Sequence, residues 1–158
     1  MSSSLPPRNF SWLQEGKLAG LAYPSSKSDI QYLMSQGIKH LITLTESPLS
    51  STIDIDGFVN LKFSHIPVVD LTPPTLDQIK EFLKIVEQTN SKGEAVAVHC
   101  QYGKGRVGTM LACYLVETKR LCAKDAIATV RSKRPGSIET VEQEKVIVKF
   151  AEYLKQCE

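Results

Sequence analysis

The stretch HCQYGKGRVG, residues 99–108, contains a cysteine and an arginine separated by five residues, two of which are glycines. Such a loop can turn its backbone N–H groups inward, and a helix that begins behind it adds a positive end, so that the loop binds an oxyanion and favours a thiolate. Arg106 can bind two oxygens of the same anion. The segment therefore predicts a phosphate site with Cys100 as its nucleophile.

The backbone of this loop is expected to bind the phosphate. Gly103 and Gly105 permit the left-handed or crowded conformations that turn successive N–H groups inward. Lys104 adds positive charge at the pocket mouth, or is simply a solvated lysine. A bare Cys-x5-Arg arises easily by chance, but the apolar strand before it and the helix after it favour the functional interpretation. The expected phosphate-binding residues are Gln101, Tyr102, Gly103, Lys104, Gly105 and Arg106.

A second segment, HIPVVDLTPP (residues 65–74), has one acidic residue followed by two rigid prolines. A carboxylic acid placed by a loop can protonate the leaving group of a phosphate ester. We therefore expect Asp70 to be the general acid; the alternative is an ordinary turn aspartate.

The elements that must position these residues follow from hydrophobic periodicity. Apolar runs predict strands at residues 17–22, 38–45, 59–67 and 94–99, the third near a sheet edge and the last in the centre. Helical spacing predicts helices at 29–36 with Ser28 as N-cap, 75–90 capped by Thr75, 105–119, 123–133 and 141–155. The alternation predicts an α/β fold with a central, mostly parallel sheet of four to five strands flanked by helices. Ligands bind at the carboxyl ends of such strands, where Cys100 lies.

Length and composition favour one domain. The chain has 158 residues, of which 42% are hydrophobic and 23% charged; we expect a flexible leader at 1–8 and a single catalytic domain at 9–158. A net charge of +2 favours neither nucleic acid nor a membrane surface as a partner. Without a signal peptide, the four cysteines read as reduced thiols in the cytoplasm, with the nucleus as a further location, and none has zinc spacing. We therefore expect no metal.

The motif HCQYGKGRVG resembles the H-C-x-x-G-x-x-R loop of the cysteine-dependent protein tyrosine phosphatase superfamily. The segments NFSWLQEGKLAGLAYP, HLITLTE, GEAVAVHC, GTMLACYLV and RPGSIETVEQEK further resemble its small atypical dual-specificity members, over residues 9–153. The resemblance implies a protein tyrosine phosphatase-like fold and hydrolysis of phosphotyrosine, and of phosphoserine or phosphothreonine, through a phosphocysteine and without a cofactor. Cys100, Arg106 and Asp70 match the nucleophile, the phosphate clamp and the acid.

The same resemblance assigns supporting residues. It implies that His99 bonds the backbone of the phosphate loop, that the turn after Arg134 lies beside the site, and that Gln143 positions the hydrolytic water. Val107 departs from the family pattern, which has Ser or Thr there to donate a hydrogen bond to the sulfur. We therefore expect a slower second step and less thiolate, but intact phosphate binding.

Other functions remain open at this stage. A phosphoinositide or RNA 5′-phosphatase would use the same loop, although the loop has a single lysine. A weakly active phosphate-binding module would explain Val107, and a rhodanese-like sulfurtransferase would not require the Asp-Pro loop. The leading expectation is a monomer that acts on phosphorylated proteins.

Overall fold

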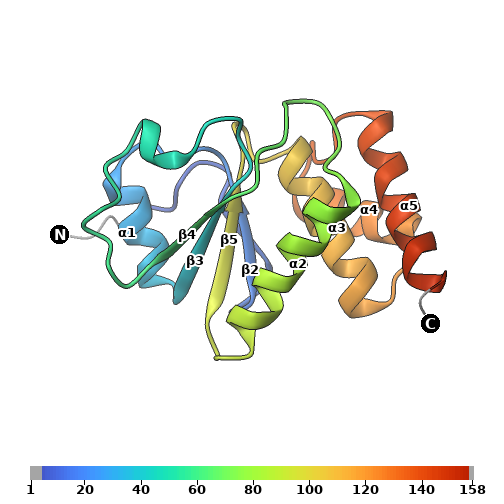
Figure 1. Cartoon of the computed structure of the whole chain (residues 1–158), viewed down its shortest axis with the longest axis horizontal. Helices are drawn as coiled ribbons and strands as arrows, with labels where there is room; N and C mark the ends of the chain where they lie inside the picture. The colour runs from blue at the N-terminus through green and yellow to red at the C-terminus, as the bar shows by residue number, and fades with distance from the viewer. Residues whose placement is uncertain (1–4, 157–158) are drawn as a thin grey trace.

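Strand β5 (Ala95–His99) lies in the middle of a five-stranded sheet in the computed structural model, which describes residues 5–156 (Figure 1). The strand order is β1-β2-β5-β3-β4. Strands β2 (Leu18–Leu21), β5, β3 (Ile38–Thr43) and β4 (Lys62–His65) are parallel, and β1 (Ser11–Gln14) pairs with β2 in the antiparallel sense. The predicted α/β class and the central position of β5 are confirmed.

Helices cover both faces of the sheet because side chains alternate along each strand. In β5, Val96 and Val98 belong to the larger core cluster, whereas Ala95 and Ala97 belong to the smaller one. The larger cluster includes buried residues of α2 (Leu76–Asn90), α3 (Gly105–Lys119), α4 (Ala123–Lys133) and α5 (Val141–Gln156). Helix α1 (Lys27–Ser35) covers the other face.

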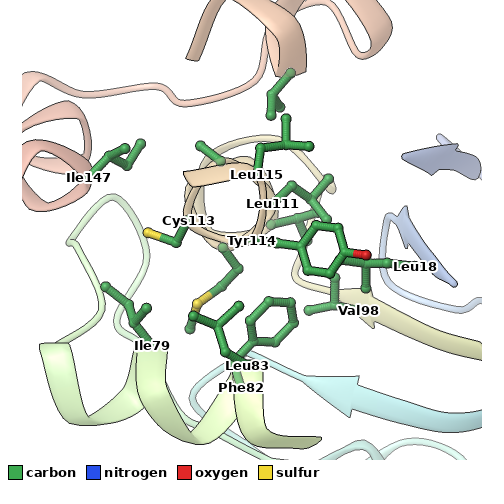
Figure 2. Packing of buried hydrophobic residues seen from close by; sticks show 14 of the residues in the cluster. Leu18, Ile79, Phe82, Leu83, Val98, Leu111, Cys113, Tyr114, Leu115 and Ile147 are labelled. Carbon is green, nitrogen blue, oxygen red and sulfur yellow. The ribbon is translucent and has the colours of Figure 1, made fainter. Parts of the chain in front are cut away.

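Helix α3 follows β5 directly, and its residues from Gly105 to Val116 are all buried. Figure 2 shows Leu111, Cys113, Tyr114 and Leu115 of α3 among side chains of α2, α5 and the sheet. The loop that joins β5 to α3 is therefore anchored in the core at both ends.

Three local predictions need correction. Strand β1 was not predicted, because it is a four-residue edge strand without clear alternation. The strand expected at 59–67 comprises only Lys62–His65, and Val59 is 84% exposed. Helix α1 begins after Ser26 rather than Ser28. The Thr75 cap is confirmed, since Thr75 and Gln78 form a reciprocal capping box.

Part of the predicted leader is described. Residues 1–4 lie outside the described residues, as does Cys157. Pro7 is buried, and the carbonyl of Arg8 accepts a 2.9 Å hydrogen bond from the Ala22 amide, next to the end of β2. Within residues 5–156, no helix has the length and apolar character needed to cross a membrane.

Candidate active site

The predicted phosphate loop, residues 100–106, leaves the carboxyl end of the central strand and enters α3. Cys100 is 3% exposed and belongs to the larger core cluster. Gly103 has φ +74°, and a Cβ there would lie 2.6 Å from the backbone carbon of Leu21. Only glycine allows this close approach without moving β2.

The carbonyl groups of the phosphate loop accept hydrogen bonds from other parts of the chain, whereas its amides have no hydrogen-bond partner among the described residues. Within the described part of the chain, no backbone N–H from residue 101 to 107 has a hydrogen-bond partner. An array of unpaired amides at a helix N-terminus is a binding site for a tetrahedral anion. Four carbonyls accept from groups elsewhere in the chain: Gln101 O from Tyr23 N (3.0 Å), Tyr102 O from Asn9 Nδ2 (3.0 Å), Gly103 O from Arg134 Nη2 (2.6 Å) and Lys104 O from Ile138 N (3.1 Å).

Arg106 is 3% exposed and is anchored by one edge of its guanidinium. Its Nη1 donates to Glu46 Oε1 and to the carbonyl of Val68, both at 2.8 Å. Its Nε is buried without a partner, and its Nη2 lies 3.4 Å from Asp70 Oδ1. The Nε–Nη2 edge is therefore the one that can bind two oxygens of a phosphate.

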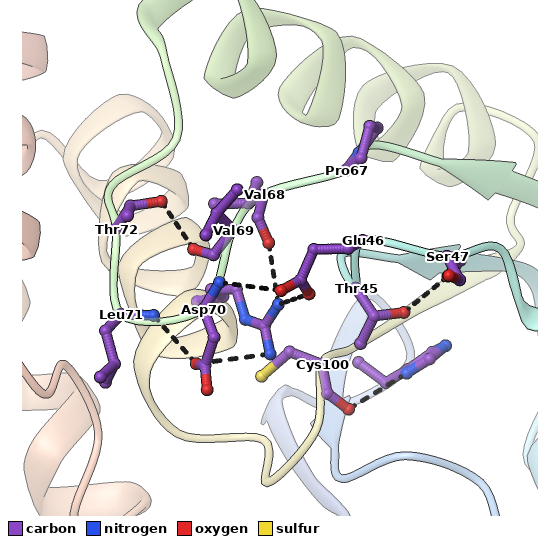
Figure 3. Close-up of polar contacts among 12 residues, drawn as sticks. Thr45, Glu46, Ser47, Pro67, Val68, Val69, Asp70, Leu71, Thr72 and Cys100 are labelled. Carbon is purple, nitrogen blue, oxygen red and sulfur yellow. Dashed lines mark hydrogen bonds and ion pairs between the residues drawn. The ribbon is translucent and has the colours of Figure 1, made fainter.

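Asp70 lies on the loop between β4 and α2, residues 67–74, which we call the acid loop. Its side chain is 50% exposed, and Oδ1 accepts a 2.9 Å hydrogen bond from the Leu71 amide. Figure 3 shows the carboxylate of Asp70 and the thiol of Cys100 pointing toward each other. Leu71 has φ +66°, a left-handed conformation that is costly for leucine. The candidate acid therefore faces the candidate nucleophile on a strained backbone.

Glu46 connects the two loops (Figure 3). Besides its ion pair with Arg106, its Oε2 accepts a 3.4 Å hydrogen bond from the Asp70 amide. The pKa of Glu46 lies below its ordinary value, first because its own backbone amide donates to the carboxylate and second because Arg106 does. The structure thus makes Glu46 a partner of Arg106.

His99 lies beneath the loop on the face of β5 opposite Cys100. Its Nδ1 donates to the carbonyl of Cys100 (3.3 Å), and its Nε2 accepts from the Thr43 hydroxyl (2.7 Å). Burial lowers the pKa of His99 to about 4, although the bond to Cys100 acts in the opposite direction. The ring is thus neutral near pH 7 and fixed in one tautomer.

Val107 and Gln143 flank the start of α3. Val107 is fully buried, with its side chain against Gly20 of β2. Gln143 Oε1 accepts from the amides of residues 139 and 140, while its Nε2 is buried without a partner. A Cβ on Gly105 would lie 3.0 Å from that Nε2, so Gln143 adjoins the phosphate loop as the resemblance implied.

A pocket of about 510 Å³ opens over Arg106. Hydroxyl and amide side chains make up most of its wall, and the charged groups beside Arg106 are the carboxylates of Glu46 and Asp70. The lining residues are Tyr23, Thr45, Glu46, Ser47, Ser51, Thr52, Asp70, Gln101 and Arg106.

Comparison with known proteins identifies the family. A family model described as the DSP-PTPase phosphatase domain of Swiss Army Knife proteins matches residues 7–147. The chain belongs to this family of dual-specificity phosphatase domains. The human dual specificity protein phosphatase CDC14C is 34% identical over 133 residues, which cover 83% of this chain and 28% of that protein. The mouse protein tyrosine phosphatase domain-containing protein 1 is 33% identical over 163 residues, which cover 91% of this chain and 22% of that protein.

Solved structures of phosphatases share the fold. The crystal structure of Tk-PTP in the active form has a TM-score of 0.80 at 26% identity and covers 91% of this chain and 97% of that one. PTPMT1 in complex with PI(5)P has a TM-score of 0.83 at 18% identity, with 94% and 97% covered. This phosphatase domain spans about a quarter of the length of the curated relatives named above.

Sequence reasoning missed two residues that shape the phosphate loop. Arg134 and Asn9 bind loop carbonyls although they lie 31 and 93 positions away from their partners. Arg134 was expected only to precede a turn near the site. For Asn9, no sequence signal linked it to the loop.

Proposed function

We propose that this domain hydrolyses phosphate monoesters on proteins, acting on phosphotyrosine and also on phosphoserine or phosphothreonine. One observation carries the proposal: the loop that begins at Cys100 has unpaired amides, and the Nε–Nη2 edge of Arg106 at its other end can bind two oxygens of a phosphoryl group. Family membership supports the same chemistry.

In the first step, the Cys100 thiolate attacks phosphorus and the bond from phosphorus to the substrate oxygen breaks. Asp70 gives its proton to the departing oxygen, so that the product leaves as a neutral alcohol or phenol. The loop amides and Arg106 stabilise the negative charge of the transferring group. The product of this step is a phosphocysteine.

In the second step, Asp70 takes a proton from a water molecule that attacks the phosphocysteine. The bond from sulfur to phosphorus breaks, phosphate leaves, and the thiolate returns. The unpartnered Nε2 of Gln143 supports its role in holding that water beside Gly105. Val107 offers the departing thiolate no hydrogen bond, which slows this step.

The charge around the pocket supports a protein substrate. Two carboxylates and a wall of neutral hydroxyl groups surround the single phosphate site. A singly phosphorylated side chain needs only that site, whereas the additional phosphates of an inositol headgroup would meet Glu46 and Asp70 in this pocket, which Lys104, the other cation of the loop, does not line.

The test is phosphate release from three substrates side by side: a phosphotyrosine peptide, a phosphothreonine peptide of the same sequence, and PI(5)P in detergent micelles. We expect both peptides to be hydrolysed, with kcat/KM values well above that for PI(5)P. Preferential hydrolysis of PI(5)P would show instead that the domain is a phosphoinositide phosphatase.

A further inference from the structure

A buried arginine lies under the phosphate loop, outside the H-C-x-x-G-x-x-R motif. Arg134 follows α4 and is 2% exposed. Its Nη2 donates to the Gly103 carbonyl at 2.6 Å, the shortest of the bonds to the loop given above. Its Nη1 donates to neutral acceptors of the N-terminal segment and of β2, namely Asn9 O (2.9 Å), Ser11 Oγ (2.7 Å) and Gly20 O (3.1 Å).

The charge of Arg134 has no carboxylate to balance it. None of the ion pairs among residues 5–156 includes Arg134, and its Nε is buried without a hydrogen-bond partner. Burial lowers the pKa of Arg134 to about 10, and the negative charge of Cys100 acts in the opposite direction. An unpaired buried cation is costly, so a nearby anion is needed to compensate it.

The position of Arg134 relates it to Val107. A Cβ added to Gly20 would lie 2.8 Å from Val107 Cγ1 and 3.2 Å from Arg134 Cζ. The valine and the guanidinium therefore meet at the same point of β2, directly below the loop. Where the family pattern that the phosphate loop resembles has Ser or Thr, this chain has a valine with a buried cation near it.

We propose that Arg134 is a positioning residue that stabilises the Cys100 thiolate in place of the hydroxyl that Val107 lacks. It acts in two ways. Its bond to Gly103 holds that carbonyl outward, which keeps the loop amides turned toward the anion. Its buried positive charge interacts with a negative charge on Cys100 through a medium of low dielectric constant. The expected effect of Arg134 on turnover rests on the proposed function. Its expected effect on the protonation of the Cys100 thiol does not.

Other charged groups around the loop act on the thiol too. Arg106 and Lys104 favour the thiolate, whereas the carboxylates of Asp70, Glu46 and Glu139 oppose it; Glu139 Oε1 lies where a Cβ on Gly105 would be only 2.6 Å away. His99 is neutral and lies on the opposite face of β5. Because these groups are unchanged in Arg134 variants, a shift in those variants reports Arg134 itself.

The experiment measures alkylation of Cys100 by iodoacetamide as a function of pH, read by mass spectrometry on the tryptic peptide of residues 93–104, which contains no other cysteine. We expect Arg134→Gln to move the half-maximal pH upward by about one unit or more, a tenfold loss of thiolate at lower pH. Arg134→Lys keeps the positive charge but lacks the guanidinium that binds several acceptors at once. We therefore expect a smaller shift of the half-maximal pH, together with a lower kcat.

The matched control is Arg131→Gln. Arg131 lies one turn earlier on α4 and bonds the carbonyls of Ser137 and Ile138 rather than the loop. It should leave the half-maximal pH unchanged. Adding Val107→Thr to Arg134→Gln should restore part of the lost thiolate.

An alkylation profile equal to wild type in folded Arg134→Gln would overturn the inference. If that variant does not fold, Arg134→Lys decides: an unchanged profile together with an unchanged kcat overturns it. Since alkylation needs no turnover, wild-type protein that hydrolyses none of the three substrates would refute the proposed function and leave this test valid.

Discussion

The phosphate loop and the acid loop face the same pocket, but their central residues are held with different firmness. The phosphate loop is anchored at both ends in the core, and partners from distant segments bind its carbonyls at 2.6–3.2 Å. In the acid loop, Val68 is buried and bonded to Arg106, but the residues after it lie at the surface. Val69 is 60% and Leu71 53% exposed, and Asp70 and Leu71 are tied to Glu46 and Thr140 by contacts of 3.4 Å.

In the proposed mechanism, this difference separates phosphate binding, by the phosphate loop, from proton transfer, by the acid loop. The anion site exists before substrate arrives, so its stabilisation of the transition state costs little reorganisation. The acid is held by few contacts, and Arg106 Nη2, which lies 3.4 Å from Asp70, is needed by the phosphate. We infer that bound phosphate takes the place of Asp70 at Arg106 Nη2, which leaves the carboxyl group free to contact the leaving oxygen. Substitutions in the acid loop should thus leave phosphate binding intact, and the nucleophile can be replaced without loss of the anion site.

The largest effect is expected from Cys100→Ser. Loss of the nucleophile should lower kcat by at least about 10⁴-fold, whereas the amides and Arg106 should still bind vanadate or phosphate. Steady-state kinetics and calorimetric titration measure the two properties. If the serine variant turned over at a rate near wild type, catalysis by the phosphate loop would need another nucleophile.

Asp70→Asn tests the other loop. We expect the rate with phenyl phosphates to fall by roughly 10²–10⁴-fold, the range for a lost general acid. The loss should shrink as the leaving group becomes more acidic, because such a group departs without a proton, and anion affinity should hardly change. A loss of equal size across the leaving-group series would remove Asp70 from the acid role.

His99 makes the phosphate loop sensitive to pH. Because its pKa is about 4 when folded and near 6.5 when unfolded, the unfolded chain binds the proton first as pH falls. The contribution of neutral His99 to the free energy of unfolding is therefore fully present above pH 6.5. It decreases by about 3 kcal/mol as the pH falls from 6.5 to 4. Urea denaturation across this window should show that decline in wild type, and His99→Gln should lack this part of it. Parallel curves for the two proteins would contradict the assignment.

Val107→Thr should have the smallest effect. The threonine keeps the branched shape and adds one donor, which raises kcat by about threefold to tenfold through faster hydrolysis of the phosphocysteine. Any burst of leaving group in rapid mixing should decrease. If neither kcat nor the burst changes, Arg134 and the loop amides already stabilise the thiolate sufficiently in wild type. Val107→Thr should then have a larger effect on kcat when it is added to Arg134→Gln.

The sequence predicts the parts of this site that are contiguous in the chain. Cys100, the glycines and Arg106 lie in one strand-loop-helix segment, and Asp70 is placed by its prolines. Arg134, Asn9 and the pairing of Glu46 with Arg106 are contacts between distant segments, which no periodicity reveals. Edge strands are equally hidden: β1 is short and half-buried, and β4 is shorter than its alternating pattern suggested.

The central claim, covalent catalysis by Cys100 on a preformed anion site, is tested most directly by trapping the intermediate. Asp70→Asn keeps the phosphate loop but lacks the base for the second step. With an aryl phosphate that has an acidic leaving group, the phosphocysteine should therefore form faster than water hydrolyses it. After rapid acid quenching, mass spectrometry should find one phosphoryl group on Cys100 in the peptide of residues 93–104. A burst of leaving group with that peptide unmodified, or with the phosphoryl group on another residue, would contradict the account.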